Sequence, residues 1–191
     1  MIKIAGSARR TFIFPADLPT AYAYYGDVSR VLTYLPHISL VRAYTYDRFR
    51  MLYSTIELGL YHVRIFCDLQ TTLSGENRQV IRIGPLESIL PVRSEAGFHS
   101  MTAQGCYSSI STFFEAGDKT RIDYSMSLQA TLPTPLGLRF MPGTVLDSIA
   151  KSITGSRIHE IASGFIERSI DAFPYWLEEL QQPKRKRARV A

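Results

Sequence analysis

The eleven tyrosines are the residues of this sequence best suited to contact a small molecule. A phenol presents an apolar ring and a polar tip, so a tyrosine in a cavity can contact an apolar ligand and still donate a hydrogen bond. Several tyrosines fall in segments with the alternation of strands, namely Tyr44, Tyr46, Tyr53, Tyr61, Tyr107 and Tyr124. Tyr124 has the parity of an apolar strand face and is a candidate ligand contact. The alternative is a core tyrosine bonded to a backbone carbonyl.

The other groups that could do chemistry form no recognisable constellation. The four histidines, His37, His62, His99 and His159, are scattered without the spacing of metal ligands. Ser156, Arg157 and His159 lie close in the sequence, but their spacing identifies no base and no orienting carboxylate for a hydrolase triad. No glycine-rich phosphate loop occurs. We therefore assign no catalytic residue, no metal ligand and no cofactor.

The sequence contains two cysteines, Cys67 and Cys106, each inside a predicted strand. Two are too few for a disulfide scaffold or for a zinc site built on cysteine. We expect both to be buried, reduced thiols that pack as small apolar residues.

The formal charge of +5 comes from the C-terminal end, because five basic residues follow Pro183: Lys184, Arg185, Lys186, Arg187 and Arg189. Without them, the basic and acidic residues of the chain are balanced. A basic tail on a neutral body predicts a disordered arm. Such an arm can contact an anionic membrane surface, whereas nucleic acid is not an expected partner.

The N-terminal part predicts one strand followed by two short helices. Residues 3–14 form the strand, which Pro15 ends because proline has no N–H for a sheet ladder. Asp17 can cap a first helix. Asp27 can cap a second helix over residues 28–35.

From residue 38 to residue 132 the pattern has period two, with β-branched and aromatic enrichment, which predicts a meander of antiparallel strands. We place three apolar sets on the concave side: Leu52, Ile56, Leu58 and Leu60; Val63, Ile65, Cys67 and Leu69; Ile122, Tyr124, Met126, Leu128, Ala130 and Leu132. Turns are expected at residues 47–48 and 75–77. The connection over residues 84–97 is long enough to be a flap over a cavity mouth.

After residue 135 the apolar period becomes helical. We expect Gly155-Ser156 to divide a short leading helix from a long amphipathic helix over residues 156–173. Pro174 should kink that helix or start a new turn. The apolar face of the long helix should lie on the sheet.

This order of elements predicts an α+β fold, in which a curved antiparallel sheet of about six or seven strands surrounds the C-terminal helix. We expect one domain over residues 1–182 and a basic tail over residues 183–191. The apolar runs are too short for a secretory signal or a membrane span. The chain is therefore expected to be cytoplasmic, or in the plastid stroma if it comes from a plant.

Two segments carry a resemblance to a known superfamily. FPADLPTAYAYYGDVSRVLTYLPHI (residues 14–38) resembles the opening of START-like, polyketide-cyclase-like proteins, the SRPBCC or helix-grip superfamily. LPTPLGLRFMPGTVLDSIAKSITGSRIHEIASGFIERSIDAFPYW (residues 132–176) resembles the end of a domain-of-unknown-function branch found in cyanobacteria and plastids. The Gly155-Ser156 step and the basic tail depart from that pattern. The resemblance implies a helix-grip (START or Bet v 1-like) fold with a cavity for lipids or other apolar molecules, and it transfers no catalytic residue.

These observations predict a cavity between the sheet and the C-terminal helix, lined by Leu58, Ile65, Tyr107, Tyr124, Met126, Ile158, Ala162, Phe165 and Ile166. Its function would be binding or transport of a hydrophobic small molecule that is lipid-, quinone- or pigment-like. Two alternatives stay open. One is a polyketide cyclase or aromatase-like enzyme, which needs a buried polar group with a shifted pKa in the cavity. The other is a membrane- or complex-associated assembly factor.

Overall fold

A computed structural model describes residues 1–75, 79–87 and 90–181, and within these ranges eight strands form one sheet. The N-terminal elements are β1 (Ile2–Phe14), α1 (Leu18–Gly26), α2 (Val28–Val31), the 3-10 turn η1 (Leu32–Tyr34) and β2 (Ile38–Ala43). The central elements are β3 (Arg48–Glu57), β4 (Tyr61–Ser74), β5 (Gln79–Pro85), β6 (Glu95–Ala96), β7 (Ser100–Ala116) and β8 (Lys119–Leu132). The turn η2 (Leu136–Leu138) leads to the helix α3 (Gly143–Gln181). The tail over residues 183–191 and the turn at residues 76–77 lie outside the described residues.

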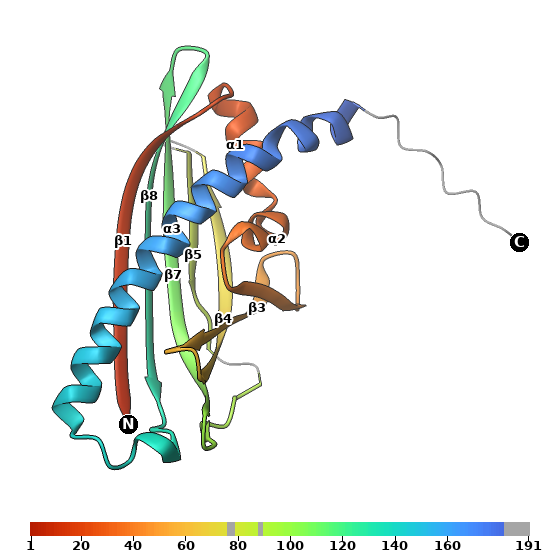
Figure 1. Cartoon of the computed structure of the whole chain (residues 1–191). Coiled ribbons are helices and arrows are strands. Elements are labelled where there is room, and N and C mark those ends of the chain that lie inside the picture. The colour runs from red at the N-terminus through yellow and green to blue at the C-terminus, as the bar shows by residue number, and fades with distance from the viewer. Residues whose placement is uncertain (76–78, 88–89, 182–191) are drawn as a thin grey trace, which may run out of the picture.

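The sheet is curved and α3 runs diagonally across one face of it (Figure 1). Its strands are ordered β1-β8-β7-β5-β4-β3-β2, and β6 pairs with β7. Beyond the end of the short strand β5, β7 pairs directly with β4 in parallel, from His62–Phe66 to Ser100–Gln104. The α+β architecture predicted from the sequence is confirmed, with the two-residue β6 as an additional strand.

The two short helices after β1 are also confirmed, together with their caps. The backbone N–H of Thr20 donates to Asp17 Oδ1 at 3.0 Å, and that of Arg30 donates to Asp27 Oδ1 at 3.3 Å. These bonds satisfy amide groups that have no partner inside a helix at its first turn. Each aspartate therefore fixes where a helix begins.

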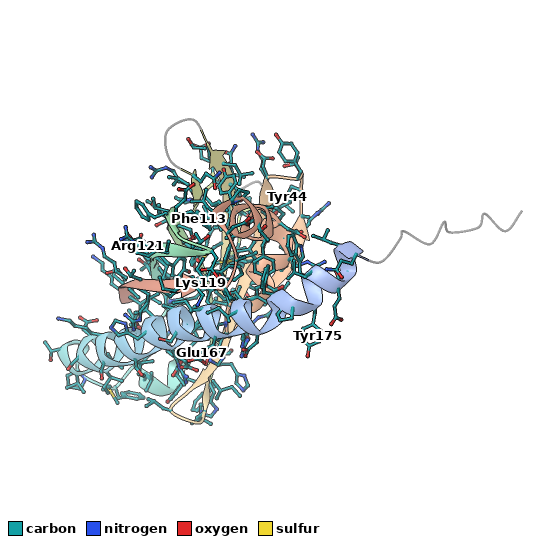
Figure 2. The ribbon with its side chains drawn as sticks, turned by 90° about the horizontal axis from the view of Figure 1, so that it is seen from above. Tyr44, Phe113, Lys119, Arg121, Glu167 and Tyr175 are labelled. Carbon is teal, nitrogen blue, oxygen red and sulfur yellow. The ribbon has the colours of Figure 1, made fainter. Side chains whose placement is uncertain are left out.

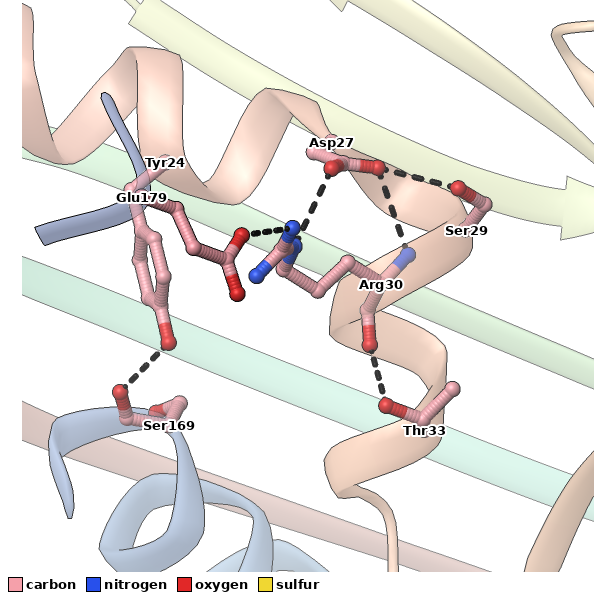
Figure 3. A network of polar contacts seen from close by, with 7 residues as sticks. All are labelled: Tyr24, Asp27, Ser29, Arg30, Thr33, Ser169 and Glu179. Atoms are coloured by element: carbon pink, nitrogen blue, oxygen red, sulfur yellow. Dashed lines mark hydrogen bonds and ion pairs between the residues drawn. The ribbon is translucent and has the colours of Figure 1, made fainter. Parts of the chain in front are cut away.

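Polar contacts tie the same two helices to α3 (Figure 3). The hydroxyl of Tyr24 donates to the carbonyl oxygen of Ser169 at 2.7 Å, and Arg30 Nη2 donates to Glu179 Oε2 at 2.7 Å. Beneath these bonds the ring of Phe14 packs edge-on against Phe173, with centroids 4.7 Å apart. Aromatic side chains thus pack the C-terminal half of α3 tightly against the sheet.

The prediction of a helix break at Gly155-Ser156 is wrong, because α3 is continuous over 39 residues. A glycine inside a helix costs about 1 kcal/mol relative to alanine but does not stop it. Burial at helical spacing continues across the step from Leu146 through Thr154 to Ile158. Pro174 also lies within the helix. At 1.5 Å per residue α3 is roughly 58 Å long, and Glu167 and Tyr175 lie on its exposed side (Figure 2).

The face predicted for β3 is wrong as well. Met51, Tyr53 and Thr55 are buried, whereas Ile56 is half exposed. The register with β4 explains this, since the buried β3 residues pair with Cys67, Ile65 and Val63, which face the core. Apolar side chains occur on both faces of β3, so alternation alone could not identify the buried one. The apolar faces predicted for β4 and β8 are confirmed.

The segment predicted as a flap covers a different face. The backbone N–H of Leu86 donates to the carbonyl oxygen of Asp68, and Arg50 Nη2 donates to that of Leu90. Arg50 and Asp68 alternate with the core residues Met51 and Cys67, so they belong to the outer face of the sheet. The described part of this segment around Leu86 and Leu90 therefore lies over a buried ion pair and not over α3.

Candidate ligand-binding pocket

A pocket lies between the N-terminal half of α3 and the sheet. Its sheet side includes Ile2 and Ile4 of β1, Tyr53 of β3, Val63 of β4, and Leu128 and Leu132 of β8. Its helix side includes Leu146, Ile149, Ala150, Ile153, Ile158 and Ile161. The lining is mostly aliphatic because both faces present their apolar stripe to the same space.

The pocket offers about 90 Å³ to the centre of a water-sized sphere. One water needs roughly 10–15 Å³ by that measure, so several waters would fit, or the apolar end of a larger ligand whose remainder extends through the opening. Leu58, at the rim, is 63% exposed. Leu58 and Gly59 have positive φ angles of 53° and 67°, which is the pattern of a type I′ hairpin turn. This turn holds an apolar side chain at the opening.

Glu57 and Arg157 are the two charged residues of the lining among the described residues. Arg157 Nε and Nη2 donate to the two carboxylate oxygens of Glu57 at 3.0 and 3.3 Å, and Nη1 donates to Glu160 at 2.6 Å. His37 Nε2 lies 2.9 Å from the other oxygen of Glu160. The hydrogen bonds to His37 and Arg157 lower the pKa of Glu160, so its carboxylate stays charged at neutral pH.

Tyr53 is the buried phenol of this pocket. Burial raises its pKa, and the charge of Glu57 raises it further. The phenol therefore stays protonated at neutral pH and can act as a hydrogen-bond donor. This protonation state makes Tyr53 unsuited to act as a general base.

A second, much smaller void of about 20 Å³ lies under α1 and α2. Tyr107, Tyr124 and Phe165 line it, and the hydroxyls of the two tyrosines are 3.3 Å apart. Burial raises the pKa of both phenols. By the same measure of volume the void has room for one or two waters.

The residues predicted to line one cavity fall in three places. Leu58 and Ile158 line the main pocket, and Tyr107, Tyr124 and Phe165 line the small void. Ile65, Met126 and Ala162 belong to the buried core, and Ile166 packs against it. Along β4, β8 and α3 these core residues lie next to or between residues of the two cavities, so packed side chains fill the middle of the helix-sheet interface.

Sequence reasoning missed the contribution of β1 and of α3 before Gly155. Ile149, Ala150 and Ile153 line the pocket but were assigned to a separate leading helix. Their helical spacing with Ile158 was the signal that could have found them. Ile2 and Ile4 have the two-residue spacing of a strand, which places both side chains on the face of β1 that lines the pocket.

The prediction of two buried thiols holds for Cys67 alone. Burial raises the pKa of Cys67 to about 12. Cys106 is exposed, because it pairs with Gln129 on the outer face of the sheet.

In the described part of the chain, no helix is both long and apolar enough to cross a membrane.

Several solved structures are similar to this chain at low sequence identity. The di-domain aromatase/cyclase StfQ of the steffimycin biosynthetic pathway matches with a TM-score of 0.51 and 11% identity, over 92% of this chain and 52% of StfQ. A START superfamily protein from Mycobacterium smegmatis matches with a TM-score of 0.47 and 11% identity, over 89% and 98%. The Zhui aromatase/cyclase from Streptomyces sp. R1128 has a TM-score of 0.47 and 10% identity, over 94% and 97%.

The similarity to StfQ, together with the strand order and the long C-terminal helix, confirms the helix-grip fold predicted from the sequence. No protein-family model and no curated protein matches the sequence. The resemblance to the cyanobacterial and plastid branch therefore stays a prediction.

Proposed function

We propose that this protein binds or transports a hydrophobic small molecule, lipid-, quinone- or pigment-like, in the pocket between α3 and the sheet. The observation that carries the proposal is the aliphatic lining of a space that opens to solvent beside Leu58. Burying an apolar group there is favourable by about 25 cal/mol per Å² of area removed from water. Of the residues first predicted to line the cavity, Leu58 and Ile158 remain proposed ligand contacts.

Filling the pocket tests this proposal. Ala150 lines the pocket from α3 and is half-buried, so Ala150→Trp would place an indole where the ligand should lie. We expect the delipidated wild type to bind the neutral fluorescent probe N-phenyl-1-naphthylamine, and Ala150→Trp to weaken that binding about tenfold or more, since the probe would lose most of its buried area. A fluorescence titration measures both.

The matched control is Ala23→Trp, which adds the same indole at an exposed position of α1. It should bind the probe like the wild type. Equal probe binding by the wild type and Ala150→Trp, with both proteins folded, would place the bound probe outside this pocket and contradict the proposal.

We also propose that Lys184, Arg185, Lys186, Arg187 and Arg189 contact an anionic membrane surface, because five positive charges occur within six residues. Each basic residue near such a surface contributes about 1 kcal/mol. Removing residues 183–191 should abolish cosedimentation with phosphatidylserine vesicles at low salt, while neutral vesicles should bind neither protein. Undiminished binding to anionic vesicles after the deletion would show that the tail is not the contact.

A further inference from the structure

We infer that the charged end of the pocket selects against anionic ligands, so that the ligand's polar end is uncharged or cationic. This inference rests on the proposed function of the same pocket. It follows from how Glu57 and Arg157, the charged residues of the lining, are paired.

Arg157 would by itself attract a carboxylate ligand, because a guanidinium matches a carboxylate with two parallel hydrogen bonds. Here that side-on geometry is already occupied, since Nε and Nη2 both donate to Glu57. The remaining nitrogen, Nη1, donates to Glu160 at 2.6 Å. These bonds use three of the five N–H groups of the guanidinium, so a fatty-acid carboxylate could bind side-on only by displacing a carboxylate that the fold itself supplies.

The balance of charge at this end is also unfavourable for an anion. One guanidinium faces two carboxylates, Glu57 and Glu160. The side chain of Glu57 is only 13% exposed, so water screens its charge less than that of a surface residue. The other partner of Glu160 is His37, whose side chain is 32% exposed, so water screens it more than it screens Glu57. With His37 neutral, an incoming carboxylate therefore meets a surplus negative charge at the pocket, whereas an ammonium group meets an attraction.

Uncharged polar groups of a ligand also have partners in the lining of the pocket. The hydroxyl-bearing side chains of Tyr53, Tyr61, Thr55 and Thr154 all contribute to the lining. Burial keeps the phenol of Tyr53 protonated by raising its pKa, so it can donate to a ligand oxygen. A hydroxyl or carbonyl group on the ligand would thus be accommodated without disturbing the ion pairs.

A matched set of probes tests the inference on the full chain. Octylamine and sodium octanoate carry opposite charges at pH 7 on chains of equal length, and octanol is the uncharged reference. Each should be measured by displacement of N-phenyl-1-naphthylamine. We expect octylamine to bind about tenfold more tightly than octanoate, as the charge imbalance near a partly buried carboxylate implies.

The variant Glu57→Gln removes one of the two carboxylates and should bring the octylamine-to-octanoate ratio down about tenfold. Glu160→Gln should also lower this ratio, and it replaces Glu57→Gln as the test variant if Glu57→Gln does not fold. Glu178→Gln, an exposed carboxylate 21 residues beyond Arg157 on the same helix, is the control that should leave the ratio unchanged.

Equal binding of octylamine and octanoate by the wild type, or tighter binding of octanoate, would overturn the inference. A ratio that does not respond when either Glu57 or Glu160 is replaced would overturn it too. Failure of all three probes, octanol included, to displace the fluorophore would instead contradict the proposed function of the pocket.

Discussion

Replacing Asp68 by alanine is expected to lower the free energy of unfolding by about 3–5 kcal/mol, because it would leave the charge of Arg50 buried without its carboxylate. Arg50 Nε and Nη2 donate to the two oxygens of Asp68 at 2.7 and 2.6 Å. The side chains are 10% and 1% exposed. The hydroxyl of Tyr44 also donates to Asp68, at 3.3 Å. Urea denaturation followed by circular dichroism measures the loss.

Two further variants make this result specific. Asp123→Ala removes the carboxylate of an exposed pair with Arg121 on the same sheet, and should cost about 1 kcal/mol or less. The double replacement Arg50→Met with Asp68→Leu should recover much of the stability, because well-packed apolar side chains often substitute for a buried ion pair at little cost. A loss for Asp68→Ala no greater than that for Asp123→Ala would contradict this account.

Gly105→Val is expected to destabilise the protein by about 3 kcal/mol, at the upper end of the usual cost of overpacking. A Cβ at position 105 would lie 2.6 Å from Ile65 Cγ2 and 2.8 Å from the backbone oxygen of Gln129. The oxygen belongs to β8, which is held in register with β7 through the pair Gly105–Ala130. The oxygen cannot move away without shifting β8, and Ile65 Cγ2 can move only if a fully buried side chain changes its rotamer.

The matched control for this substitution is Gly84→Val, another strand glycine. A Cβ at position 84 meets no atom within 4 Å, so valine can be accommodated in β5. Thermal unfolding of the two variants should separate their melting temperatures by about 6–12 °C, given the usual shift of 2–4 °C per kcal/mol for a chain of this size. Similar melting temperatures would show that β7 and β8 tolerate a side chain at Gly105.

The elements with clear local signals could be predicted from the sequence. Asp17 and Asp27 each precede a helix as side-chain caps, and β8 alternates cleanly between apolar residues such as Ile122 and polar ones such as Asp123. The strand β3 was predicted, but its buried face could not be assigned in this way, because Met51 and Leu52 are both apolar. Pairing with β4 determines which of them is buried, and pairing is a property of the tertiary structure.

The periodicity of the sequence could not predict where along the interface the pocket lies. An apolar stripe shows which face of a helix meets the sheet, but not where the two surfaces leave a gap. Large side chains such as Phe165 and Phe173 fill the C-terminal half of the interface, whereas Ala150 and Ile153 leave the N-terminal half open. The expected break at Gly155 separated that half from the rest of the helix and concealed it.

Methyl-labelled NMR spectra recorded during an octanol titration would test the central claim most directly. We predict that the isoleucine and leucine methyl shifts change at the pocket, above all for Ile4, Leu132, Ile149 and Ile153, and stay constant for Ile83 beside the small void. Saturable changes confined to that set would place an apolar ligand between α3 and the sheet. Unchanged shifts throughout the titration, or changes only at residues outside the set, would contradict the account.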